Sequence, residues 1–146
     1  MSPIRSNEQT LARHARLAGY AGLLPFVAPL LVIWGEPAWA AQAIAVQQAY
    51  AALILSFLGG IYWAVALNRQ AAGWIWLSVL PSLWAWPALL IPPVAASVML
   101  AAGFALMFLL ERSARKQGWI RAWFYQLRLT LGTVAIFTLL LGLVMP

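Results

Sequence analysis

The chain has 146 residues, a single-domain length, yet 64% are hydrophobic and only 8% are charged, against ~25% charged in typical globular domains. Because so few charged side chains cannot cover the surface of a soluble protein, the composition indicates an integral membrane protein. The net charge is +6, but the basic residues flank apolar runs and form no contiguous face of the kind that binds nucleic acid. The absence of cysteine excludes disulfides, thiolate metal sites and cysteine nucleophiles.

The chain begins with a polar stretch, residues 1–16, which predicts a cytoplasmic arm ahead of the first membrane span. Within the arm we expect Asn7 to Arg16 to form a short interfacial helix, with Thr10 as a candidate cap. The apolar stretch that follows is longer than a signal-peptide core and lacks an obvious cleavage site. We therefore expect it to be retained as the first span.

Five apolar runs are long enough to cross a bilayer as helices, which takes about 17 to 25 residues each. The predicted spans cover residues 17–34, 43–67, 74–91, 94–110 and 129–145. Spanning segments must satisfy their own backbone hydrogen bonds, so helices are expected throughout. The sequence thus predicts an all-α, five-span bundle that forms one transmembrane domain over residues 17–146.

The basic residues predict the orientation of this bundle. With five spans, the N-terminal arm and the loops at residues 68–73 and 111–128 fall on one side, and they contain all nine Lys and Arg residues. The positive-inside rule then places the N-terminus in the cytoplasm and the C-terminus outside. One span more or fewer would distribute the basic residues over both sides of the membrane, so this distribution also supports the count of five. The expected location is the cytoplasmic (inner) membrane of a bacterium.

The last loop ends in a stretch, Gly118 to Arg128, that alternates bulky aromatic residues with arginines. It predicts a second interfacial helix at the level of the headgroups. Basic side chains there would meet anionic phospholipid headgroups, each adding ~1 kcal/mol near the surface. The residues expected to make these contacts are Arg112, Arg115, Lys116, Arg121 and Arg128. Simple anchoring of the chain is the plainer interpretation.

The second span contains small residues at a spacing of four, which places them on one helix face. Such a stripe lets another helix approach closely, and close packing holds membrane helices together. The predicted helix-packing residues are Ala52, Ser56, Gly60 and Ala64, with the adjacent Gly59.

The same span carries two glutamines, Gln47 and Gln48, in its outer third. A buried amide in hydrocarbon needs a partner, so we expect at least one to hydrogen-bond to another helix or to line a wet cavity. Packing is the first interpretation. The alternative is a polar pocket that opens to the outer side and is shared by Gln47, Gln48, Ser56 and Tyr62.

Prolines inside the first and third spans predict helix kinks, because each removes a backbone hydrogen bond. They are Pro25, Pro29, Pro81 and Pro87. Freed carbonyls could coordinate an ion or a substrate, as in transporters with broken helices. Bending around neighbouring helices is the simpler interpretation.

The sequence offers no catalytic set and no metal site. One His, three Glu and no Asp or Cys cannot supply a metal cluster, a nucleophile triad or a carboxylate pair. Ionisable residues at mid-depth mark ion and proton pathways, but Glu36 is expected in the outer loop, Glu111 at an inner edge and His14 in the arm. We therefore expect a non-enzymatic protein with no cofactor and no metal.

Four blocks of the sequence resemble a known family. They are LAGYAGLLPFV at residues 17–27, YAALILSFLGGIYWAVALNR at 50–69, LSVLPSLWAW at 77–86 and AWFYQLRLTLGTVA at 122–135. With these blocks the chain resembles the family of domain of unknown function 3429, small bacterial membrane proteins similar to eukaryotic transmembrane protein 69. The resemblance implies a multi-pass membrane protein and assigns no chemistry to any residue.

Two functional hypotheses follow. In the first, the protein is a structural or accessory component that packs with itself or with a larger membrane complex through the stripe from Ala52 to Ala64. In the second, it is a small transporter or a lipid- or small-molecule-binding protein with a cavity near the second helix. The small-residue face and the lack of mid-membrane charge favour the first.

Overall fold

The computed structural model describes the backbone of residues 3–144 and the side chains of residues 7–144. The end of the last predicted span at Met145 and the side chain of Arg5 lie outside the described residues. The helices are α1 (Pro3–Ala21), α2 (Leu24–Gly35), the 3-10 helix η1 (Pro37–Trp39), α3 (Ala40–Arg69), α4 (Ala72–Ala88), α5 (Pro93–Lys116) and α6 (Ala122–Leu141). All regular structure in this part of the chain is helical, which confirms the all-α prediction.

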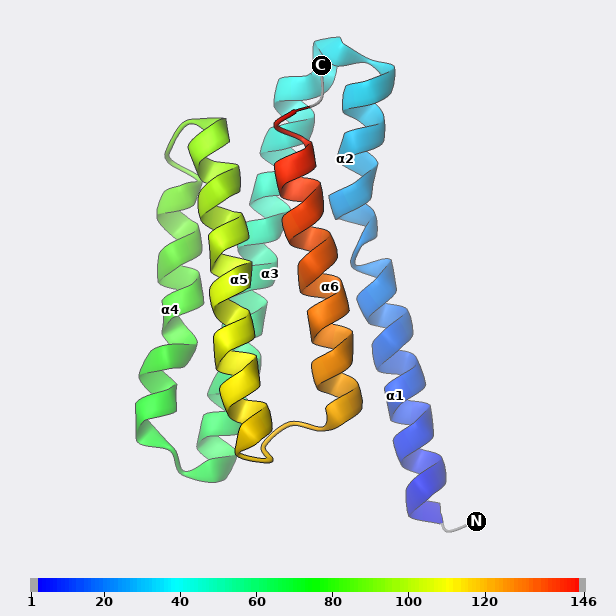
Figure 1. Ribbon diagram of the computed structural model, residues 1–146, viewed down its shortest axis with the longest axis vertical. Helices are drawn as coiled ribbons and strands as arrows, with labels where there is room; N and C mark the ends of the chain where they lie inside the picture. The colour runs from blue at the N-terminus through cyan, green and yellow to red at the C-terminus, as the bar shows by residue number, and fades with distance from the viewer. Residues whose placement is uncertain (1–2, 145–146) are drawn as a thin grey trace.

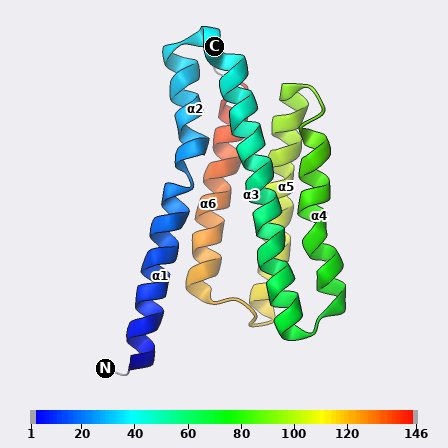
Figure 2. The same cartoon turned by 180° about the vertical axis from the view of Figure 1, so that it is seen from behind.

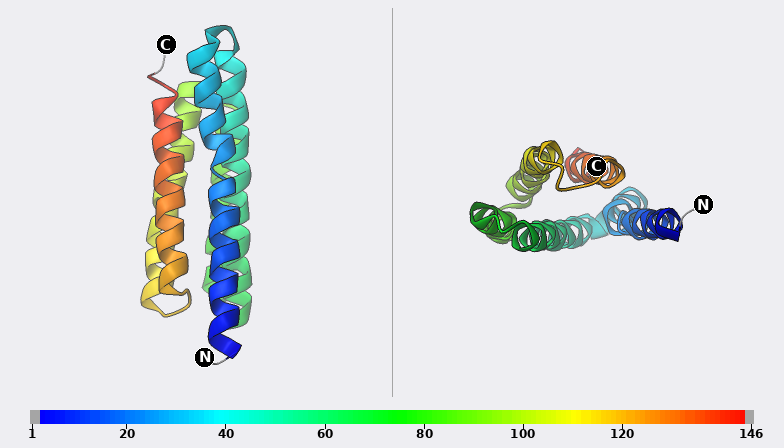
Figure 3. Two further views of the ribbon diagram at one scale, coloured as in Figure 1. Left: turned by 90° about the vertical axis from the view of Figure 1, so that its right-hand side faces the viewer. Right: turned by 90° about the horizontal axis from the view of Figure 1, so that it is seen from below.

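The helices run up and down the long axis of the molecule in chain order (Figure 1). α1 and α2 stack end to end as one rod, and α3, α4, α5 and α6 follow in alternating directions. Viewed from below, the rod, α3 and α4 form one layer, and α5 and α6 form a second (Figure 3). Figure 2 shows the first layer in front. The N-terminal end of α1 therefore shares one end of the bundle with the α3–α4 and α5–α6 connections.

Within the described part of the chain, four helical segments are long and apolar enough to cross a membrane: Asn7–Gly35, Pro37–Arg69, Pro93–Lys116 and Ala122–Leu141. α4, which coincides with most of the third predicted span, has 17 residues, at the lower limit for a span. Large apolar side chains cover the outside of the bundle, including Leu53 and Phe57, which are 67% and 65% exposed. Such a surface is suited to lipid, so the spanning helices place the protein in contact with a bilayer.

The N-terminal arm is not a separate unit, because α1 continues without interruption across the predicted boundary at residue 16. Thr10 lies inside this helix, so it is not a cap. The break in the rod comes at Gly22–Leu23, just before Pro25 in the first turn of α2. Proline has no N–H to donate to the carbonyl of Ala21, four residues earlier, so the helix restarts there. The sequence predicted this interruption.

The other three prolines that were predicted to kink helices lie inside helices that continue past them. Pro29 is buried within α2, and Pro81 and Pro87 lie within α4. Each leaves one helical carbonyl without its usual donor, but none of the three ends its helix.

α5 and α6 differ most from the prediction. α5 continues six residues beyond the predicted end at residue 110, to Lys116, where its basic last turn complements the helix dipole. Gly118, with a φ of 71°, then ends it: the N–H of Trp119 donates to the carbonyl of Ala114 at 2.9 Å. α6 begins at Ala122. The predicted interfacial helix over residues 118–128 is therefore wrong, since most of that stretch forms the first turns of α6.

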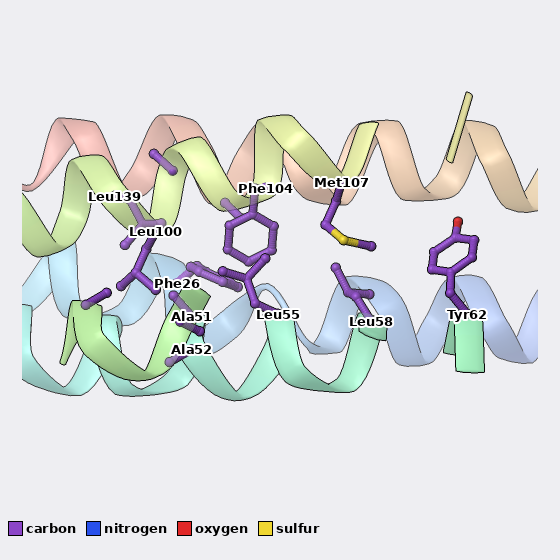
Figure 4. Close-up of a cluster of buried hydrophobic side chains, with 14 of the residues drawn as sticks. Phe26, Ala51, Ala52, Leu55, Leu58, Tyr62, Leu100, Phe104, Met107 and Leu139 are labelled. Carbon is purple, nitrogen blue, oxygen red and sulfur yellow. The ribbon is translucent and has the colours of Figure 1, made fainter. Parts of the chain in front are cut away.

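The core lies between the two layers and is built from apolar side chains of α2, α3, α5 and α6, with smaller contributions from α4 (Figure 4). Phe26 packs edge-on against Phe104, with ring centroids 5.9 Å apart. Gly103 brings α5 close, since a Cβ there would lie 2.9 Å from Leu55 Cδ1 and 3.0 Å from Trp84 Cδ1. A larger residue at this position would have to displace both side chains, so glycine favours the close approach of the three helices.

Candidate functional site

Two charged side chains pair inside the bundle. Arg128 of α6 donates from Nε to Glu111 Oε1 of α5 at 2.9 Å, and the two residues are 7% and 0% exposed. The sequence placed Glu111 at an inner edge and Arg128 against lipid headgroups. The expected lipid contact of Arg128 is wrong, because its side chain turns into the core. Glu111 lies toward the basic end of the bundle, but α5 continues past it and its side chain is buried as well.

The helical register explains why these two residues face inward. Glu111 follows Phe104 and Met107 at spacings of seven and four, on the buried face of α5. Arg128 precedes Gly132 and Ala135 on the buried face of α6. Each charged residue therefore occupies the next position of a buried apolar stripe. The pair could have been found in the sequence by extending the helical periodicity of the buried positions past the last apolar residue to Glu111 and Arg128.

The ion pair leaves hydrogen-bonding capacity unused. Glu111 Oε2 and the hydroxyl of Tyr62 are buried and have no partner among the described residues. Figure 4 shows Tyr62 at one end of the core, with its hydroxyl directed from α3 toward the layer of α5 and α6. Buried polar atoms are rarely unsatisfied, and ionisable groups within a membrane protein commonly mark functional sites. We refer to Glu111, Arg128 and Tyr62 as the polar cluster.

Aromatic rings pack against the polar cluster. The ring of Tyr62 lies 6.1 Å from that of Trp74, which in turn lies 4.8 Å from Trp119. Trp74 is in the first turns of α4, and Trp119 is in the α5–α6 connection. These rings therefore link Tyr62 to the connections at the basic end of the bundle.

An apolar cavity of about 390 Å³ lies between the α1–α2 rod, α3 and α6, and Arg128 is the charged residue of its lining. On the α1 side the wall is made of small residues, including Ala15, Ala18 and Gly19. Tyr50 also lines it, but its hydroxyl already donates to the carbonyl of Gly22 at 2.9 Å. The volume falls in the lower part of the range of small-molecule sites. The cavity thus combines apolar walls with one guanidinium.

The two glutamines of α3 lie in the other half of the bundle and are satisfied. Gln47 Nε2 donates to the carbonyl of Phe26 at 2.7 Å. Gln48 Nε2 donates to the carbonyl of Pro93 at 2.7 Å and to Ser97 Oγ at 2.9 Å. The expected hydrogen bond to another helix is therefore confirmed for both residues.

The predicted polar pocket on α3 is not formed. Gln47 and Gln48 are buried against different helices, α2 and α5. Ser56 is exposed, and Tyr62 lies about four turns beyond Gln48 along α3, beside Glu111. The structure thus separates the four residues, and only Tyr62 belongs to the polar cluster.

The small-residue stripe of α3 faces mostly outward. Ala52 and Gly59 are buried, whereas Ser56, Gly60 and Ala64 are exposed. A Cβ on Gly60 would meet nothing within 4 Å, but one on Gly59 would collide with the carbonyl of Ser78 in α4. Close approach within the chain therefore uses Gly59. Packing of the outward residues against another chain stays a prediction.

The four other residues predicted to contact anionic lipid are exposed at the end that holds the α5–α6 connection. Arg112, Arg115 and Lys116 are exposed, and Arg121 forms an ion pair with Glu8 of α1. Their contact with anionic lipid stays a prediction. Among the described residues, no group of three or more His, Asp or Glu side chains could hold a metal ion.

Comparison with known proteins identifies the family. The sequence matches, over residues 11–144, the family described as "Protein of unknown function (DUF3429)". The chain belongs to this family. The DUF3429 match includes every residue of the polar cluster and of the cavity lining. The resemblance drawn from the four sequence blocks is thus confirmed.

This DUF3429 chain is also similar to Transmembrane protein 69 of Xenopus tropicalis, with 36% identity over 135 residues. The alignment covers 86% of this chain and 52% of that protein, so the chain spans about half the length of the curated relative it matches. No solved structure matches.

Proposed function

We propose that this DUF3429 protein is a non-enzymatic membrane protein that binds one apolar or amphipathic small molecule, such as a lipid, inside its helix bundle. The observation that supports this proposal is the apolar cavity of about 390 Å³ with Arg128 in its wall. Nε of Arg128 is engaged by Glu111, but a guanidinium carries further N–H donors. These donors suit the polar group of a ligand whose apolar part fills the cavity.

The orientation belongs to the same proposal. The basic residues occupy the end of the bundle shared by the start of α1 and by the α3–α4 and α5–α6 connections. Following the positive-inside rule, we place this end in the cytoplasm of a bacterium and the C-terminus outside. In this arrangement α4 also crosses the inner membrane, which brings the number of crossings to five. Exposed basic side chains then lie beside anionic headgroups.

A cavity-filling substitution tests the binding function. Ala18 is exposed at the mouth of the cavity and lines it, so Trp at this position can fill the space without displacing the core. Ala21→Trp on the same helix is the matched control, because Ala21 is exposed and does not line the cavity. The measurement is native mass spectrometry of each variant released from its own membranes in mild detergent.

The wild type and Ala21→Trp are expected to retain one specific small-molecule adduct, and Ala18→Trp is expected to lose it. Equal adducts in all three proteins, or none in the wild type, would count against the proposal.

A second candidate function, that of an accessory component, is supported by the outward face of α3. Ser56, Gly60 and Ala64 leave a shallow strip into which another membrane helix could pack. Gly60→Leu would fill this strip and is expected to abolish a homo-oligomer or a co-purifying partner. Ala45→Leu, which enlarges an exposed residue of the same helix outside the cavity lining, is the control. Unchanged assembly in Gly60→Leu would refute this second function.

A further inference from the structure

A second hollow, of about 530 Å³, lies between α1 and the start of α6 and shares no lining residue with the cavity. Arg13, Arg16 and Tyr20 line it from α1, and Trp123 lines it from α6. These segments lie at the basic end of the bundle (Figure 1). For helices that cross a bilayer, this is the level of the lipid headgroups.

The charges of this hollow are not balanced by the protein. Arg13 and Arg16 are exposed and three residues apart, so they project from neighbouring positions of one helix. Neither forms an ion pair in the part of the chain whose side chains are described. Glu8, the acidic residue of the lining, is paired with Arg121. Two guanidinium groups are thus free to bind an anion.

Trp123, which lines the hollow, has a buried donor with no partner in the described chain. The indole Nε1 of Trp123 is buried and has no acceptor among the described residues. Indole N–H is a donor only, so its missing partner must be an acceptor. Leu17 supplies apolar surface beside the arginines. The hollow therefore combines donors and positive charge with an apolar side, the chemistry of a phospholipid at the interface.

We propose that this hollow binds the phosphate headgroup of one anionic phospholipid. Arg13 and Arg16 bind the phosphate oxygens, for which the guanidinium fork is geometrically suited. The indole of Trp123 contributes its N–H to the same headgroup, and Leu17 contacts the adjoining glycerol and acyl carbons. The site needs neither the cavity nor Arg128, so it stands or falls independently of the function proposed above.

The test measures lipid selectivity. The protein is stripped of lipid and exposed to equal amounts of phosphatidylglycerol and phosphatidylcholine, and the bound lipid is counted by native mass spectrometry. The test variant is Arg13→Gln with Arg16→Gln. The control, Arg112→Gln with Arg115→Gln, removes the same charge from exposed residues of α5 outside the hollow.

The wild type and the control are expected to retain one phosphatidylglycerol selectively, and the test variant is expected to lose roughly tenfold or more of that selectivity. Trp123→Phe keeps a ring but removes the N–H, and we expect a loss of roughly threefold. Circular dichroism checks that each variant keeps its helices.

Three outcomes would overturn the proposal. Equal losses in the test and control variants would show general attraction of anionic lipid by the basic end. Equal binding of both lipids by the wild type would show no headgroup site. Full displacement of the lipid by millimolar inorganic phosphate would show a site for free anions. Phosphate that fails to displace the lipid supports the phospholipid assignment.

Discussion

Two groups of buried polar side chains, in different halves of the bundle, differ in how fully they are hydrogen-bonded. Toward the α2–α3 turn, the amides of Gln47 and Gln48 donate to carbonyls of two neighbouring helices. Toward the basic end, Glu111 and Arg128 form an ion pair, but Glu111 Oε2 and the Tyr62 hydroxyl have no partner in the described chain.

The difference supports the proposed division between a structural group and a ligand-binding group. A buried amide that finds its partner within the protein holds helices together and requires nothing further. A buried carboxylate and a hydroxyl left unsatisfied cost stability, and such atoms call for a ligand, a water or a functional reason. The second group, and not the first, adjoins the apolar cavity through Arg128. We therefore assign packing to the glutamines and binding to the polar cluster.

The largest effect is expected when the ion pair is broken from one side. Arg128→Met leaves the Glu111 carboxylate buried without a counter-charge and should destabilise the protein by about 3–5 kcal/mol. The double variant Glu111→Leu with Arg128→Met removes both charges and should recover most of this loss. Reversible unfolding in mixed detergent micelles measures both. A single variant that costs less than about 1 kcal/mol would mean that Glu111 reaches water.

A smaller effect is expected at the glutamines. Gln48→Leu removes the donor that joins α3 to Pro93 and Ser97 of α5, and should cost about 1–2 kcal/mol in the same unfolding assay. In a Ser97→Ala background the loss should shrink, because one acceptor is already absent. The small-molecule adduct expected for the wild type in native mass spectrometry should persist in Gln48→Leu. Loss of the adduct from a folded Gln48→Leu protein would erase the distinction between the two polar groups.

The smallest effect on stability is expected at Tyr62. Because its hydroxyl has no partner in the described chain, Tyr62→Phe removes no internal hydrogen bond. In protein stripped of bound molecules, it should change the unfolding free energy by less than about 1 kcal/mol, toward higher stability. A destabilisation of about 2 kcal/mol or more would show that the hydroxyl is satisfied within the protein, as the amides are.

Much of the fold follows from hydropathy and chain breakers. The turn around Glu36 and the end of α3 after Asn68 and Arg69 agree with the predicted ends of the first two spans. The cross-helix bonds of Gln47 and Gln48 were also predictable, since an amide in hydrocarbon must find a partner. Their partners on α2 and α5 were not, because those depend on how the helices pack.

The polar cluster was missed because a hydropathy window ends at a charge. Glu111 looks like the end of a span when its neighbours Arg112 and Arg115 follow it in sequence. Its counter-ion, Arg128, lies 17 residues away and becomes adjacent only when α6 packs on α5. Two opposite charges can each extend the buried face of a different helix and pair across the interface. Because they are far apart in sequence, the pairing cannot be recognised before the helix packing is known.

The glycine pair of α3 shows a similar limit. A stripe of period four includes Gly60 and omits Gly59, but Gly59 is the one that α4 approaches at Ser78. An α-helix repeats every 3.6 residues, so a strict period of four drifts around the helix. Which of two adjacent glycines faces inward is decided by the position of the neighbouring helix.

The most direct test of the central claim is a crystal structure in a lipidic mesophase, from protein purified out of its own membranes without delipidation. We predict continuous density for one bound molecule between the α1–α2 rod, α3 and α6, with a polar group at the Arg128 guanidinium and Glu111 paired to its Nε. An empty or closed cavity, with α1 packed directly against α3, would contradict the account.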